Sequence, residues 1–354
     1  MAILARRLPW PTHANRKLWS SYLPHAQAIL EFKDQCPEDE NLLPLQHSVA
    51  KGYYLLGKYA ESEEMHRQTL ALRETVLGRE HPDTLVSMNN LANVLDSQGK
   101  YTDAEQMHRQ TLALRETVLG REHPDTLVSM NNLAESLRQQ GKHSEAEEMH
   151  RQTLALRETV LGREHPDTLG SMNNLAGSLQ QQGKYSEAEE MHRQTLALKE
   201  TVLGREHPST LASMNNLAGS LRQQGKYSEA EEMHRQTLAL RETVLGREHP
   251  DTLDSINNLA LVLDSQGKHS EAEDMHRQTL ALRETVLGRE HPSTLASMNN
   301  LALVLDSQGK YVEAEEIHRQ TLGLTETVLG REHPDTLASM NNLAAVLRDM
   351  EMRS

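Results

Sequence analysis

The sequence is poor in aromatic residues. Only 3% of its 354 residues are Phe, Tyr or Trp, and its mean hydropathy is −0.66. Both tryptophans, Trp10 and Trp19, and the single phenylalanine, Phe32, lie near the N-terminus. The rest of the chain must pack with Leu, Ala, Met and Val. This suits thin helical layers better than a deep core, which aromatic side chains usually dominate.

Other features are also scarce. The one cysteine, Cys36, excludes an internal disulfide and fits a reducing compartment, so we expect a cytoplasmic protein. No apolar run reaches the roughly 18 residues that a membrane span needs. The formal net charge is −14, whereas binding to a phosphate backbone needs a basic surface. Neither a membrane nor a nucleic acid is therefore expected as a partner.

The N-terminal segment differs in charge from the rest of the chain. The stretch MAILARRLPWPTHANRKLWSSYLPHAQAIL has four basic residues and no acidic one. That composition resembles a mitochondrial transit peptide. However, Pro9 and Pro11 interrupt the amphipathic stretch that such a peptide needs, so we favour a basic first helix.

The chain contains a 42-residue repeat. A Gly-Lys pair recurs at Gly57, Gly99, Gly141, Gly183, Gly225, Gly267 and Gly309, and a His-Pro pair at His81, His123, His165, His207, His249, His291 and His333. A period of this length predicts a solenoid, a propeller or a repeat array. Propeller blades are excluded, because no alternating β-branched runs separate the turns.

One repeat, residues 124–162, predicts two helices. Pro124 suits the first position of a helix, and Gly141 ends it. Ser144 and Glu147 are spaced as a capping box, which predicts the start of a second helix at Ser144. Gly162 closes that helix. The apolar positions form one stripe on each helix, namely Leu127, Met130, Leu133, Ala134 and Leu137, then Ala146, Met149, Leu154, Leu156 and Leu161. Each repeat is thus a helical hairpin that must stack on its neighbours.

The segment SMNNLAESLRQQGKHSEAEEMH, which includes Leu133-Ala134, Gly141 and Ala146, resembles a tetratricopeptide (TPR) repeat. The usual length of such a repeat is about 34 residues. The 42-residue variety with the linker VLGREHP resembles kinesin light chain. The segment MHRQTLALRE resembles the C-terminal TPR arrays of fungal NOD-like receptors (NB-ARC or NACHT proteins). The resemblance implies an all-α, right-handed α-solenoid. His150 and Thr153 depart from it, because TPRs usually place Tyr or Phe and Ala there.

The resemblance divides the chain into two parts. Residues 42–354 form the array, with seven hairpins, the first degenerate, and a final unpaired helix that is either an end cap or a truncation. Residues 1–41 form an N-terminal capping helix and linker. In that helix, bent at Pro24, the apolar residues share one face: Leu18, Trp19, Tyr22, Leu23, Ala26 and Leu30.

The copies differ mainly at five positions of the first helix, at 128, 135, 136, 138 and 139 and their equivalents. At 100° per residue these positions share one side of the helix with Asn131 and Asn132, away from the apolar stripe. In TPR proteins that side lines a concave groove, and the resemblance implies that it binds an extended peptide or a partner surface. Neutral drift and recent duplication with local sequence exchange are the alternatives.

The predicted groove varies along its length. Its middle is small and basic or neutral, with Gly177, Gly219, Arg138, Gln180 and Arg222. Its C-terminal part is apolar and acidic, with Leu261, Val262, Leu303, Val304, Asp254, Asp264 and Asp306. A ladder of amides, each both donor and acceptor, is predicted to hold a peptide backbone at Asn89, Asn131, Asn173, Asn215, Asn257, Asn299 and Asn341. The alternative for Asn132 and its equivalents is a purely local tie to their own loops.

The sequence offers little for chemistry. The Glu147-x-x-His150 spacing occurs in di-iron bundles, but the facing stripe holds Leu and Met, so a buried structural histidine is favoured. The segment from Gly177 to Tyr185 has the wrong spacing for a phosphate-binding loop. We therefore expect no enzyme activity, no metal and no cofactor.

Two functions remain open. The first is the recognition arm, or a fragment, of a fungal NOD-like receptor whose nucleotide-binding module lies upstream and outside this chain. The second is a cargo adaptor like kinesin light chain. Such an adaptor needs a heptad coiled coil to join its motor, and no heptads precede residue 42, which favours the first. A protein or an extended peptide is the expected partner.

Overall fold

The computed structural model describes residues 10–12, 15–31 and 43–352. All regular structure in these residues is helical. A helix, α2 (Arg16–Glu31), is followed by seven hairpins and a last helix. The hairpins are α3 (Leu43–Leu55) with α4 (Tyr59–Val76), α5 (Pro82–Ser97) with α6 (Tyr101–Leu119), α7 (Pro124–Gln139) with α8 (His143–Leu161), α9 (Pro166–Gln181) with α10 (Tyr185–Leu203), α11 (Pro208–Gln223) with α12 (Tyr227–Val244), α13 (Pro250–Ser265) with α14 (His269–Leu287), and α15 (Pro292–Ser307) with α16 (Tyr311–Val328). The last helix is α17 (Pro334–Glu351).

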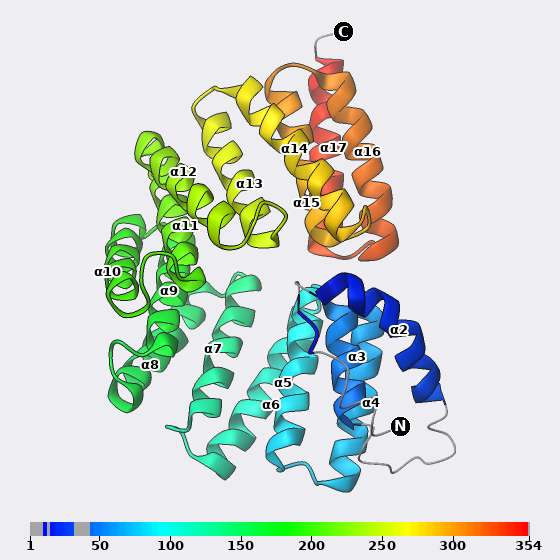
Figure 1. The fold of residues 1–354 in the computed structure, drawn as a ribbon, viewed down its shortest axis with the longest axis vertical. Coiled ribbons are helices and arrows are strands. Elements are labelled where there is room, and N and C mark those ends of the chain that lie inside the picture. The colour runs from blue at the N-terminus through cyan, green and yellow to red at the C-terminus, as the bar shows by residue number, and fades with distance from the viewer. Residues whose placement is uncertain (1–9, 13–14, 32–42, 353–354) are drawn as a thin grey trace. The chain divides into compact units, whose positions relative to one another are not determined.

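The chain forms two compact units, unit 1 (Met1–Leu156) and unit 2 (Arg157–Ser354). Within each unit, helices that follow one another in the chain pack side by side (Figure 1). The all-helical fold of stacked hairpins agrees with the prediction. The predicted boundary between residues 41 and 42 lies outside the described residues, as does Cys36.

The first helix of each hairpin begins and ends as its sequence predicts. In α7, Pro124 occupies the first helical turn, and the Nδ1 atom of the His123 side chain accepts a hydrogen bond of 3.2 Å from the backbone N–H of Asp125. At the other end Gly141 adopts a φ of 79°, and the Lys142 N–H donates to the Leu137 carbonyl at 2.9 Å. This reversal needs a left-handed residue, which explains the glycine.

The predicted capping box at the second helix is wrong. The helix α8 begins at His143, one residue before Ser144. In the other repeats the N-cap is a lysine such as Lys100 or Lys184, and no side chain caps it. The glutamate of the supposed box has stronger, charged partners. Glu105, equivalent to Glu147, accepts hydrogen bonds from Arg109 of its own helix at 2.9 Å and from Lys142 of the next repeat at 2.6 Å.

The core follows the predicted stripe of the first helices. Leu127, Met130, Leu133 and Leu137 are buried in one cluster with Ala146 of the second helix. Most apolar residues of the second helices are only half-buried, and a polar pair fills the remaining interior. That pair, His150 and Thr153, is fully buried.

The second helix of one repeat is tied to the first helix of the next by a buried arginine. Arg115 of α6 donates through Nη1 to the Asp125 carbonyl at 2.6 Å and to Ser129 Oγ at 2.9 Å. Arg157, Arg241 and Arg283 make the same pair of contacts in unit 2. The repeat with Lys199 keeps only one contact, to the Ser209 carbonyl at 3.2 Å.

Helix α2 packs on the first hairpin. Trp19, Leu23, Ala26 and Leu30 form one buried cluster with residues of α3. Trp19 lies against Gly52, where later repeats carry Ser or Val. The predicted amphipathic helix therefore exists and covers α3, whereas Leu18 at its start is exposed.

Candidate peptide-binding groove

At four of the five variable positions, the predicted groove residues lie on one side of the first helices. The fifth, position 136, is buried in both units, for example as Val94 in α5 and as Val262 in α13. Val262 of α13 packs against Leu217 and Leu221 of α11, and Val304 of α15 packs in the cluster of α13. The interpretation of Val262 and Val304 as groove residues is therefore wrong. They face the preceding first helix, where a side chain one methyl larger or smaller changes the packing between repeats.

The paired asparagines connect successive repeats. Asn132 Nδ2 donates to Asn89 Oδ1 of the preceding repeat at 2.9 Å. The same bond joins Asn258 to Asn215, Asn300 to Asn257, and Asn342 to Asn299, at 2.8–3.2 Å. The second asparagine thus ties down the neighbouring repeat, and not its own loop as the alternative supposed. Each of these bonds uses one acceptor of the first asparagine and leaves its amide donor for another contact.

The three other amides of the predicted ladder differ. Asn173 donates to Ser213 Oγ at 2.8 Å and lies 3.4 Å from His192 Nδ1, so it is engaged inside unit 2. Asn131 also has a partner within the protein. Asn341 of α17 is exposed.

The acidic residues predicted in the C-terminal part have partners inside unit 2. Asp254, whose side chain is 56% exposed, is paired with the buried Arg283. Asp264 Oδ1 lies 2.6 Å from His269 Nδ1, and Asp306 also has a partner within the protein. Of the two predicted apolar anchors, Leu303 is 38% exposed and Leu261 is half-buried. Leu303 therefore keeps the apolar surface that an anchor site needs, while the aspartates also serve the fold.

The basic residues of the middle part are half-buried. Arg138 in unit 1 forms a two-pronged pair with Glu135 of its own helix, which raises the pKa of Arg138. Arg222 in unit 2 lies close enough to His234 to add to the effect of burial, which lowers the pKa of that histidine to about 4.

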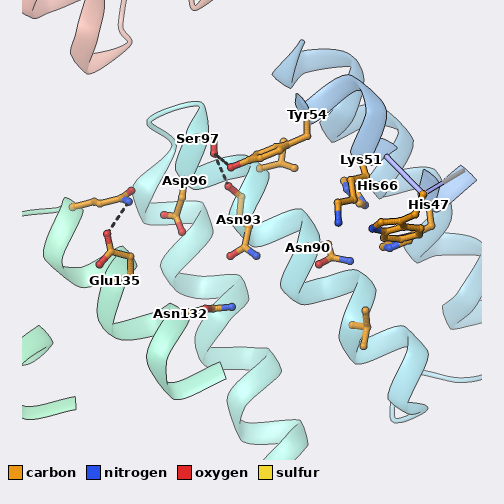
Figure 2. Close-up of a pocket in the computed structure, with 14 residues that line it drawn as sticks. His47, Lys51, Tyr54, His66, Asn90, Asn93, Asp96, Ser97, Asn132 and Glu135 are labelled. Atoms are coloured by element: carbon orange, nitrogen blue, oxygen red, sulfur yellow. Dashed lines mark hydrogen bonds between the residues drawn. The ribbon is translucent and has the colours of Figure 1, made fainter. Parts of the chain in front are cut away.

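Unit 1 contains a hollow of about 490 Å³ on the groove side of α3, α5 and α7 (Figure 2). Four of the five variable positions of the first complete repeat line it with partly exposed side chains, namely Val86, Asn93, Asp96 and Ser97, and the fifth, Val94, borders it but is only 2% exposed. The remaining lining residues are Trp10, His47, Lys51, Tyr54, His66, Asn90, Asn132, Glu135 and Gln139. We call this cavity the hollow.

The two ends of the hollow carry opposite charge. Lys51, His47 and His66 lie together at one end in Figure 2, Asp96 and Glu135 lie at the other, and Asn90, Asn93 and Asn132 lie between them. The carboxylates are already paired. Asp96 accepts a hydrogen bond from Ser136 at 2.8 Å and contacts His108 at 3.2 Å, while Glu135 is held by Arg138.

The basic end has an aromatic wall. The Trp10 ring lies 5.2 Å from the His47 ring and 4.5 Å from Lys51 Nζ. His47 and His66 meet edge to face at 5.9 Å. Burial lowers the pKa of Lys51, and burial together with His47 and Arg73 lowers that of His66 to about 4. Both histidines are therefore neutral near pH 7.

The sequence analysis did not identify Trp10, His47, Lys51 or His66 as site residues. Trp10 precedes the repeats, and His47 lies in the degenerate first repeat, where the comparison between copies is weakest. A signal was present, because His47 stands where the seven later repeats all have Asn, and Lys51 at a variable position where none of them is basic.

The described residues offer no metal site. Among them, no group of three His, Cys, Asp or Glu side chains could hold an ion. His150 of the Glu-x-x-His spacing is fully buried, and its neighbour Glu147 accepts from Arg151 at 2.9 Å. In the described part of the chain, no helix is long and apolar enough to cross a membrane.

Comparison with known proteins gives consistent results. Family models of the tetratricopeptide repeat match this chain at residues 42–117, 97–159, 125–201, 167–243, 209–285 and 294–335. A nucleotide-binding leucine-rich repeat (NLR)-like protein of Hyaloscypha variabilis is 53% identical over 88 residues, which span 24% of this chain and only 9% of that protein.

Some solved structures are similar to this chain. A putative kinesin light chain of Podosopora anserina with nearly identical TPR-like repeats is 33% identical, covers 56% of this chain and 94% of its own, and has a TM-score of 0.48. The apo form of RapI, 13% identical, covers 77% of this chain and 94% of its own at a TM-score of 0.58, and so shares the fold. The matches to the tetratricopeptide repeat models extend over most of the length of this chain. The chain therefore belongs to the tetratricopeptide repeat family.

Proposed function

We propose that the chain is a non-enzymatic, cytoplasmic scaffold that binds a protein or an extended peptide along the groove side of its first helices. One observation carries the proposal. Four of the five positions at which near-identical copies differ line the hollow of unit 1 with partly exposed side chains. Repeat proteins bind along such a side, and differences concentrated there change the partner while leaving the packing intact.

We further propose that the chain is the recognition arm, or a fragment, of a fungal NLR-like receptor. The support is the 53% identity with an NLR-like protein over 88 residues. The nucleotide-binding module implied by that relative would lie outside this chain. A kinesin light chain-like cargo adaptor is the second candidate, suggested by the 42-residue repeat and its VLGREHP linker. Co-purification with a kinesin heavy chain would favour the adaptor, and a nucleotide-binding module encoded upstream would favour the receptor.

The groove is tested by partner capture from a lysate, with matched variants in each unit. In unit 1, Asn93→Arg fills the hollow, and Gln106→Arg places the same charge on the exposed side of α6. In unit 2, Leu303→Asp alters the groove, and Val312→Asp alters a position of α16 that is 70% exposed.

We expect the groove variants to lose the captured partner and the control variants to retain it. The loss at an apolar anchor should be roughly tenfold or more in affinity. If all four variants capture the same partner equally well, the groove assignment is wrong and the second helices carry the interaction.

A further inference from the structure

A small pocket lies in unit 2 between α15, α16 and α17, which pack on one another (Figure 1). Its volume is about 120 Å³. Thr325 of α16 lines it, at a position where the last hairpin departs from all the others. The six earlier hairpins carry a basic residue there, namely Arg73, Arg115, Arg157, Lys199, Arg241 and Arg283. We call this cavity the Thr325 pocket.

We propose that the Thr325 pocket binds the guanidinium of an arginine side chain supplied by a protein or peptide partner. The inference rests on the proposed groove function, because it names one side chain that the partner would place in this part of the groove.

The preceding hairpin shows how a guanidinium is held at this position. Arg283 of α14 donates through Nη1 to the Ser293 carbonyl at 2.8 Å and to Ser297 Oγ at 2.7 Å. The equivalent acceptors of the last helix belong to Asp335 and Ser339, and both residues line the Thr325 pocket. A guanidinium from outside would therefore find the two acceptors that an internal one uses in the other repeats.

Thr325 does not take the place of the missing arginine. Its hydroxyl donates to the Leu322 carbonyl of its own helix at 3.0 Å, so it gives no hydrogen to Asp335 or Ser339. The side chain is also much shorter than arginine, and the pocket is the space that the shorter side chain leaves.

The two acceptors can take a further hydrogen bond. Ser339 Oγ donates to the Asp335 carbonyl at 2.9 Å. In the preceding hairpin Ser297 makes the same bond, to the Ser293 carbonyl at 3.3 Å, while it accepts from Arg283. Both arrangements fit together because a hydroxyl donates one bond and accepts two, and a carbonyl oxygen accepts two.

The Thr325 pocket leads from the surface to the interior. Ala296 and Ala338, which line it, are exposed, whereas Thr325 is 1% and Ser339 3% exposed. In α13 the position of Ala296 holds Asp254, which covers its arginine by pairing with it, so alanine leaves the entrance open. A guanidinium has four heavy atoms, each about the size of a water molecule at roughly 30 Å³, which matches the volume of the pocket.

Charge at the entrance favours a cation. Burial lowers the pKa of Arg115, and the nearby carboxylate of Asp125 opposes that effect. Asp335 holds the same position in the last repeat, and its side chain is 70% exposed. A cation that enters the Thr325 pocket therefore approaches a carboxylate that is still largely in solvent.

The repeats also predict a preference for arginine over lysine. Lys199 stands at the same position as Arg283, but it keeps only the contact to the Ser209 carbonyl, at 3.2 Å. A guanidinium presents several donors in a fixed plane and reaches both acceptors, whereas an ammonium on a flexible stem reaches one.

The first test is an NMR titration of the full chain with N-acetyl-arginine amide, N-acetyl-lysine amide and free arginine. We expect the arginine amide to shift the backbone amides of Thr325 and Ser339 with a millimolar Kd, and the lysine amide to bind roughly tenfold more weakly. Binding of free arginine alone would overturn the assignment to a side chain of a partner.

The second test fills the Thr325 pocket. Thr325→Arg restores the residue of the other repeats, so the fold should tolerate it, and the shifts caused by the arginine amide should disappear. The matched control is Thr327→Arg, which adds the same charge at an exposed site of α16 and should leave binding unchanged. Ser339→Ala removes one acceptor without filling the pocket and should weaken binding by roughly fivefold.

Hydrogen exchange gives an independent reading. The arginine amide at ten times its Kd should slow amide exchange in α17 by roughly tenfold, because the ligand binds only while α17 is docked. Thr325→Arg should slow the same exchange with no ligand added.

Three results would refute the Thr325 pocket: no response to the arginine amide in the unaltered chain, an equal response to the lysine amide, or a response that survives Thr325→Arg. None of them touches the groove function, which partner capture with the Asn93 and Leu303 variants tests separately.

Discussion

Replacing Gly52 by Val should release α2 from the array. A Cβ atom on Gly52 would lie 3.0 Å from Cε3 and 3.4 Å from Cζ3 of Trp19, closer than ordinary contact. Trp19 is only 1% exposed, so it cannot retreat without disturbing its cluster. The helix backbone itself accepts the substitution, because the equivalent position carries Val in α13 and α15. The change therefore tests the fit between α2 and α3 alone.

The magnitude follows from two opposing effects. Adding a side chain to a glycine inside a helix gains about 0.5 kcal/mol in propensity when the residue is Val. Forcing two extra methyl groups and a Cβ into a packed interface costs about 1–3 kcal/mol. The net loss is about 1–2 kcal/mol, and it acts on the opening of α2, which contacts the array mainly through α3. Amide exchange in α2 should therefore accelerate by roughly tenfold.

Hydrogen exchange with mass spectrometry measures this directly, because α2 is read separately from the repeats. The matched control is Gly177→Ala in α9. There an added Cβ meets no atom within 4 Å, so the same gain in propensity should stabilise the helix by about 0.5–1 kcal/mol. A second control is Trp19→Ala, in which Gly52→Val should have almost no further effect, since the clashing ring is gone.

The result also bears on the hollow. Asn15, just before α2, donates from Nδ2 to the Trp10 carbonyl at 2.8 Å and accepts from the Thr12 N–H at 2.8 Å. Release of α2 should therefore loosen Trp10 above Lys51. If Gly52→Val leaves α2 protection unchanged, the absence of a side chain at Gly52 is not what seats Trp19, and the reasoning fails.

Further predictions concern the repeats. Leu133→Ala should cost about 2–5 kcal/mol in chemical denaturation, because Leu133 is buried between layers and leaves a cavity, and a loss below about 1 kcal/mol would contradict this packing. Lys199→Arg should stabilise unit 2 by about 0.5–1.5 kcal/mol, since arginine adds the serine contact made at the other repeats; unchanged unfolding would show that this contact contributes nothing. Burial lowers the pKa of His276 to about 4, so its neutral form stabilises the fold above pH 6.5 and this contribution is lost as the pH falls from 6.5 towards 4. His276→Gln should flatten the slope of stability against pH in that window, and an unaltered slope would exclude the histidine as its source.

The sequence by itself determined the helices and the order in which they stack. The 42-residue period, the Pro after each His, and the Gly after each first helix are local signals, and they act through the backbone of a few neighbouring residues. The apolar stripe of residues 127–137 likewise follows from helical periodicity, and its burial is confirmed. These features could be predicted because each is decided within one repeat.

Only the tertiary structure decided what each polar and variable position contacts. Glu105 pairs across the repeat boundary with Lys142 and does not complete a capping box, and Val262 faces the preceding repeat and not the groove. One end of the hollow combines Trp10, which precedes the array, with Lys51 of α3 and His66 of α4. Such contacts depend on how one repeat is rotated against the next, and a repeat read alone holds no information about that rotation.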